Sequence, residues 1–142
     1  MSTASEIRKI SRLRNTASQR RRQIADMIRW GLSPAEIYDE GVVDGREVRA
    51  RSMTDVLVGI KECGLGVASI LEESNQHATF RVFQSLCCQI DGVIHPEGKK
   101  CFYLAGFIAG AIASMGGPEK VYVRELTCGD GNGGSCMLVA SW

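Results

Sequence analysis

Apolar residues recur along the chain with two different periods, and these periods predict a mixture of helices and strands. One helix is expected over residues 5–30, with a narrow apolar seam that an arginine interrupts. The seam residues stand at alternating spacings of three and four: Ile10, Leu13, Ala17, Arg20, Ile24 and Met27. Two strands joined by a hairpin turn are expected over residues 66–73 and 77–85, and in the second Ala78, Phe80 and Val82 alternate with residues of the other face. Two further strands are expected over residues 120–127 and 135–141.

Capping signals and apolar runs predict three more helices. Ser33 followed by Pro34 is a typical helix start, and we expect that short helix to end near Gly41. Helices over residues 52–63 and about 99–115 follow, the first of them stopped by a glycine. The order of the elements predicts an α+β fold: an antiparallel sheet of at least four strands packed by helices, with an N-terminal helical extension.

The helix over residues 99–115 contains two glycines, Gly106 and Gly110, that are four residues apart. Such a pair lets another backbone approach closely, and we expect it to pack on the sheet. This glycine face and the seam of residues 5–30 also offer apolar surface for a two-fold contact. A homodimer is therefore predicted.

The composition is that of one globular domain with an uneven charge distribution. The 142 residues are 44% hydrophobic and 23% charged, with a net charge of +1. Residues 1–30 carry eight basic side chains against two acidic ones, whereas residues 31–142 carry nine against fourteen. We therefore divide the chain into a basic N-terminal helical extension, residues 1–50, and a domain of residues 51–142.

The densest positive charge lies at Arg20, Arg21 and Arg22. Such a cluster could contact nucleic acid or an anionic membrane surface. We favour a solvated helix face, because no recognition motif or interleaved aromatic residues accompany the charge.

No secretory signal opens the chain, because its N-terminus is polar. We expect a cytoplasmic location, where thiols stay reduced and cysteine clusters bind metals more often than they form disulfides. The longest apolar run, residues 101–115, is too short to span a bilayer. No catalytic triad order, nucleophile motif or phosphate-binding loop is present, so the sequence does not indicate an enzyme.

Four residues near the end of the chain form a candidate zinc site: Cys101, Glu125, Cys128 and Cys136, at the spacing C-x23-E-x2-C-x7-C. Zinc binds thiolates and carboxylates in a tetrahedron, and the glycine-rich residues 129–134 let the chain return to bring the last cysteine close. The alternative is that the cysteines are simply buried and the glutamate is solvated. The spacing matches no standard zinc motif and leaves both interpretations open.

The remaining cysteines and histidines favour simpler roles. Cys87 and Cys88 are adjacent and stand among apolar residues, which favours core packing over a redox or metal role. His77 and His95 lie near expected loops. Either histidine could replace one of the zinc ligands, but we expect both to be exposed to solvent.

Several segments together resemble the 4-vinyl reductase (hydrocarbon-binding) domain family: IKECGLGVASILEE, CFYLAGFIAGAIASMGG, VYVRELTC and GGSCMLVASW. The family also supplies the sensor domains of phenol-responsive transcription activators. The resemblance covers about residues 55–142. It implies a structural zinc ion, because Cys101, Glu125, Cys128 and Cys136 match the family's zinc ligands one for one.

The resemblance also implies a pocket for a hydrophobic or aromatic small molecule, between the sheet and the helix of residues 99–115. Rough correspondence with the family and the expected facing of the strands point to Phe80, Ala105 and Val123 as lining residues. The family's phenol sensors hold the ligand hydroxyl with polar or indole side chains. No histidine or tryptophan stands at an equivalent place here, which argues against phenol itself.

The expected function is therefore a zinc-stabilised, non-enzymatic domain that binds or senses a hydrophobic small molecule. A reductase acting on a vinyl tetrapyrrole is one alternative, although no nucleotide or flavin motif supplies a hydride. A scaffold or regulatory protein is another, because the same fold occurs in vesicle-tethering subunits.

Overall fold

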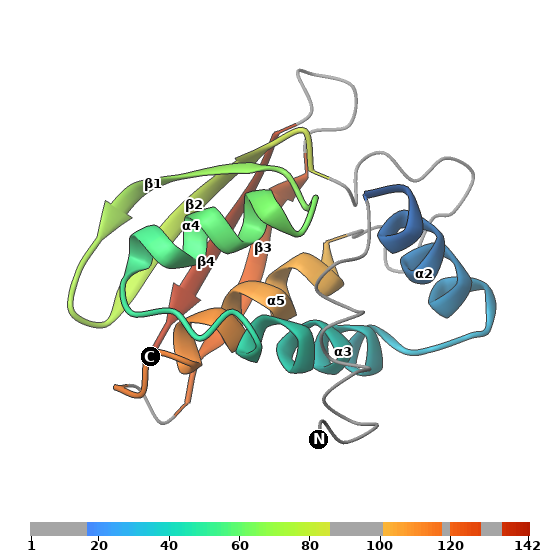
Figure 1. The fold of residues 1–142 in the computed structure, drawn as a ribbon, viewed down its shortest axis with the longest axis horizontal. Coiled ribbons are helices and arrows are strands. Elements are labelled where there is room, and N and C mark those ends of the chain that lie inside the picture. Colours follow the sequence, from blue (N-terminus) through green and yellow to red (C-terminus); the bar gives the residue numbers. More distant parts are fainter. Residues whose placement is uncertain (1–16, 86–100, 118–119, 129–134) are drawn as a thin grey trace, which may run out of the picture.

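The computed structural model of the chain describes residues 17–85, 101–117, 120–128 and 135–142. These residues form four helices and one sheet of four antiparallel strands, and the predicted α+β fold is confirmed (Figure 1). The helices are α2 (Ala17–Arg29), α3 (Pro34–Arg46), α4 (Met53–Glu62) and α5 (Phe102–Ala113). The strands are β1 (Val67–Glu73), β2 (His77–Phe83), β3 (Tyr122–Cys128) and β4 (Ser135–Ser141).

The sheet has the strand order β1-β2-β4-β3, so the last strand of the chain lies between β2 and β3. Alternate residues of β2 and β4 are buried, beginning with Ala78 and Cys136 respectively, as the period-two pattern predicts. Helices α4 and α5 lie across the sheet in Figure 1, and they contact its strands. The buried face of the sheet and the helices therefore enclose one core.

Helix α5 is the centre of the molecule. Every residue from Tyr103 to Ile112 is buried, as expected for a helix that is apolar all round. The expectation that Gly106 and Gly110 pack on the sheet is wrong, because both glycines face α3. Gly41 and Gly45 of α3 face α5 in the same way, and a Cβ at any of the four glycines would lie 1.9–2.2 Å from a backbone oxygen of the other helix.

Helix α3 continues past the end that the sequence predicts. It begins as expected, with Ser33 accepting a hydrogen bond from the Glu36 amide, but it runs through Gly41 to Arg46. Glycine costs about 1 kcal/mol relative to alanine inside a helix, so local propensity favours an end at Gly41. The backbone contact with α5 outweighs that preference, because only glycine lets the two helices approach so closely.

The seam of α2 faces the rest of the protein. Arg20, Ile24 and Met27 are all buried. Arg20 is 0% exposed, so it is not available to nucleic acid, while Arg22 is exposed and the side chain of Arg21 lies outside the described part of the chain. The described part of the seam and the glycine face of α5 are thus covered by this chain's own helices and are not available for a two-fold contact.

Arg20 belongs to a buried polar network that joins three helices. Its guanidinium donates to the hydroxyl of Tyr103 at 2.6 Å, and that hydroxyl donates to the carboxylate of Asp44. The guanidinium lies 3.7 Å from the same carboxylate. Since an unpaired buried charge is costly, this network fixes how α2, α3 and α5 pack together.

We expect this network to make the protein sensitive to alkali. Burial raises the pKa of the Tyr103 hydroxyl well above its usual value, whereas tyrosine in the unfolded chain ionises near pH 10. The folded state therefore keeps a proton that the unfolded state loses, so its contribution to stability is full below about pH 10 and declines as the pH rises further. Burial raises the pKa of the Cys63 thiol as well, which extends the decline to lower pH.

Urea unfolding at pH 8, 9.5 and 11 tests this expectation against the variant Tyr103→Phe. The variant should lose about 2 kcal/mol at pH 8, because the hydroxyl bonds to charged groups. Above pH 10 its unfolding free energy should fall less steeply than that of the wild type, by about 1.4 kcal/mol per pH unit. Equal slopes would show that Tyr103 does not titrate differently in the two states.

Candidate metal centre and neighbouring pocket

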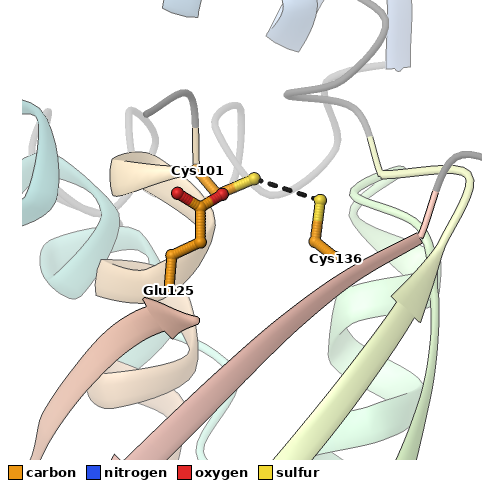
Figure 2. A group of neighbouring side chains, drawn as sticks. All are labelled: Cys101, Glu125 and Cys136. Carbon is orange, nitrogen blue, oxygen red and sulfur yellow. Dashed lines mark hydrogen bonds between the residues drawn. The ribbon is translucent and has the colours of Figure 1, made fainter. Parts of the chain in front are cut away.

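Cys101, Glu125 and Cys136 converge at one point on the edge of the core. Their ligand atoms all lie within 4.8 Å of one another, and the two sulfur atoms are 3.3 Å apart. Figure 2 shows the three side chains pointing toward a common centre from three elements. Both cysteines are buried and Glu125 is half-buried, so the centre is largely shielded from water.

The chain brings these residues together by simple local geometry. Cys101 stands directly before α5, and Cys136 is the second residue of β4. A strand residue and the third residue after it normally face opposite sides of a sheet. A register shift between Glu125 and Thr127 changes this, so that the positions of Glu125 and Cys128 both pair with buried residues of β4.

Cys128 is placed only by its backbone, which pairs directly with that of Cys136 in the β3–β4 ladder. The side chain of Cys128 lies outside the described part of the structure, as do residues 129–134. Cys87, Cys88 and His95 fall outside the described residues too. His77 is exposed, contacts Ser74 and pairs with the last residue of β4, far along that strand from Cys136.

The donor set suits a zinc ion. Two thiols and one carboxylate are ligands that zinc accepts, and two thiolates about 2.3 Å from a tetrahedral zinc lie about 3.8 Å apart. The 3.3 Å between the sulfurs of Cys101 and Cys136 is within about half an ångström of that spacing. The buried hydroxyl of Ser85 lies 3.9 Å from the Cys101 sulfur and adds a polar neighbour.

A pocket of about 300 Å³ adjoins this centre, a size that suits a small ligand. It lies between the first turns of α3, the start of α5 and the edge strand β3. Cys101 and Glu125 belong to its wall, so the candidate metal centre forms one side of the pocket. The other lining residues are Pro34, Ala35, Tyr38, Asp39, Phe102, Ala105, Tyr122, Val123 and Arg124.

The pocket combines apolar walls with a few polar groups. The backbone amide of Val123 donates to the hydroxyl of Tyr38 at 3.1 Å. The rings of Tyr38 and Tyr122 form a tilted pair with centroids 6.2 Å apart. Burial raises the pKa of the Tyr38 hydroxyl above its usual value of 10, so it stays protonated at neutral pH.

Two of the three expected ligand-binding residues, Ala105 and Val123, line this pocket, whereas Phe80 does not. Phe80 is fully buried on the helix-facing side of β2 and belongs to the core. Tyr38 and Asp39 come from α3, which the sequence assigned to the N-terminal extension of residues 1–50. No local pattern indicated that the start of α3 would lie beside β3.

Several solved structures have a fold similar to that of this chain. No protein-family model matches the chain, and no curated protein matches it in sequence. The phenol-responsive sensory domain of the transcription activator PoxR, solved with phenol, is similar with a TM-score of 0.71 and 15% identity over 90% of this chain and 75% of that chain.

Two other solved structures share the fold. A vinyl-4-reductase family protein from Methanocaldococcus jannaschii has a TM-score of 0.61 and 15% identity over 83% of this chain and 73% of that chain. A trafficking protein particle complex subunit 3 from Naegleria fowleri, covalently bound to palmitic acid, has a TM-score of 0.58 and 12% identity over 88% of this chain and 91% of that chain. The relationship that the sequence suggested is thus supported at the level of the fold.

The described helices include none that is both long and apolar enough to cross a membrane.

Proposed function

We propose that the protein is a zinc-stabilised domain that binds or senses a small hydrophobic or aromatic molecule without catalysing its conversion. The observation that carries the proposal is the shared wall: Cys101 and Glu125 belong both to the candidate metal centre and to the pocket. Loss of the metal would therefore disturb the surface on which the ligand rests.

The zinc ion would be held by Cys101, Glu125 and Cys136, with Cys128 as the fourth ligand. Support for Cys128 comes from its backbone pairing with Cys136. Four protein ligands leave no open coordination position, so the ion would act as a structural link between α5, β3 and β4. Such a link stabilises the folded state, because the ligands come together only when the chain folds.

The ligand would occupy the pocket between α3, α5 and β3. Its walls include Phe102, Ala105 and Val123, which favour an apolar or aromatic molecule. A sensory role is supported by the shared fold with a phenol-responsive sensory domain. We further propose that the protein is a homodimer and is located in the cytoplasm. Neither proposal requires a bound zinc ion.

Two other functions remain as alternatives. The fold shared with a vinyl-4-reductase family protein favours an accessory or reductase role on a vinyl tetrapyrrole, and the fold shared with a trafficking complex subunit favours a scaffold. A reductase would consume a nicotinamide cofactor when given a vinyl tetrapyrrole. A scaffold would bind a protein partner whether or not the pocket is filled.

Native mass spectrometry of the full chain, purified without added metal, tests the proposal. We expect one zinc ion per chain, a mass of two chains, and additional mass where a ligand has remained bound. The same sample under denaturing conditions should show the bare chain. A folded protein that carries no metal under native conditions would contradict the zinc assignment, and the monomer mass alone would contradict the dimer.

A further inference from the structure

Tyr38 holds its hydroxyl at a fixed place in the pocket wall. Its oxygen accepts a hydrogen bond from the Val123 amide of the edge strand β3, at 3.1 Å. Its backbone is equally constrained, because a Cβ on Gly106 would lie 1.9 Å from the Tyr38 carbonyl oxygen. The hydroxyl is thus positioned by both α5 and β3 before any ligand arrives, which is what precise recognition requires.

The hydroxyl still has a hydrogen to donate. A tyrosine hydroxyl is one donor and an acceptor, and the bond from Val123 uses only the acceptor side. Within the described parts of the chain, no acceptor receives the Tyr38 hydrogen. Because burial raises the pKa of this hydroxyl, it keeps that hydrogen at neutral and moderately alkaline pH. The pocket therefore presents one fixed hydrogen-bond donor.

The charges of the pocket disfavour an anionic ligand. Its wall contains the carboxylates of Asp39 and Glu125 and the single guanidinium of Arg124. A carboxylate ligand would meet like charge there, which weakens binding. The tilted rings of Tyr38 and Tyr122 offer instead a surface on which a neutral aromatic ring can pack.

We propose that Tyr38 is the specificity-determining residue of this pocket, and that its hydroxyl donates to an acceptor oxygen on a neutral aromatic ligand of the aryl carbonyl class. The inference rests on the proposed function, because it assigns chemistry to the same pocket. The ring would lie among the apolar and aromatic walls, with its oxygen toward Tyr38.

A matched pair of probes tests this inference: acetophenone, and α-methylstyrene, in which a methylene group replaces the carbonyl oxygen. The dissociation constants of both are measured with the full-length protein by NMR titration of the backbone amides. The variant Tyr38→Phe should bind acetophenone about tenfold more weakly than the wild type does, as the loss of one hydrogen bond predicts. Its affinity for α-methylstyrene should equal that of the wild type, because this probe offers no acceptor oxygen.

Equal affinity of the wild type and Tyr38→Phe for acetophenone would overturn the role of Tyr38 and leave the pocket standing. A selective loss of acetophenone affinity in Tyr122→Phe and not in Tyr38→Phe would mean that Tyr122 is the donor, and would overturn the inference as well. Binding of neither probe would overturn the pocket, and this inference with it.

Discussion

Replacing Cys136 by serine is expected to remove the zinc ion and most of the folded protein with it. Cys136 is fully buried, and its sulfur lies 3.3 Å from that of Cys101. Serine cannot supply a thiolate, and a structural zinc ion contributes about 10 kcal/mol or more to folding in small zinc domains. This contribution is comparable with the whole free energy of unfolding of a typical domain, which is about 5–15 kcal/mol.

The measurement is the zinc content of the purified protein together with its unfolding by urea, followed by circular dichroism. The wild type should contain one zinc ion per chain and unfold cooperatively, whereas Cys136→Ser should contain none and lack a cooperative transition. Cys63→Ser is the matched control, because Cys63 is also a buried cysteine, at the end of α4 and outside the metal centre. It should keep the metal. A metal-free Cys136→Ser variant with wild-type stability would contradict a structural zinc ion.

Replacing Gly106 by alanine is expected to separate α3 from α5. The added methyl group would lie 1.9 Å from the Tyr38 carbonyl oxygen, and backbone atoms cannot move aside as a flexible side chain can. Alanine favours a helix by about 1 kcal/mol over glycine, but overpacking of this kind costs about 3 kcal/mol or more. We therefore expect a net loss of at least about 2 kcal/mol, in spite of the better helix former.

Thermal and urea unfolding measure this loss, with Gly117→Ala as the control. Nothing lies within 4 Å of a Cβ built on Gly117, so that substitution should change stability by less than about 0.5 kcal/mol. Because Tyr38 stands at the contact with Gly106, the variant Gly106→Ala should also weaken binding in the pocket. A stabilised Gly106→Ala protein would show that the two helices are not in backbone contact.

The metal centre illustrates how far sequence reasoning reaches. Residue types and spacing singled out Cys101, Glu125, Cys128 and Cys136, and the structure brings the side chains of Cys101, Glu125 and Cys136 together. The spacing could not reveal the register shift after Glu125, through which the positions of Glu125 and Cys128 both pair with buried residues of β4. The lining of the pocket was harder to predict, because Tyr38 belongs to a helix that we assigned to the N-terminal extension of residues 1–50.

Local signals in the amino-acid sequence are enough to predict several elements. The alternation in β2, the Ser33 cap of α3 and the continuous apolar run of α5 each predict an element without reference to any other part of the chain. Which helix and strand surfaces contact one another is seen only in the folded protein. The glycines of α3 favour the end of a helix by local propensity, but in the folded protein they allow close contact with α5. Arg20 would be expected on the surface from its charge, but in the folded protein it is paired with Tyr103 and Asp44. The contacts of Arg20 with Tyr103 and of Tyr38 with Val123 join residues more than 80 positions apart, and their energies depend on burial that no local pattern records.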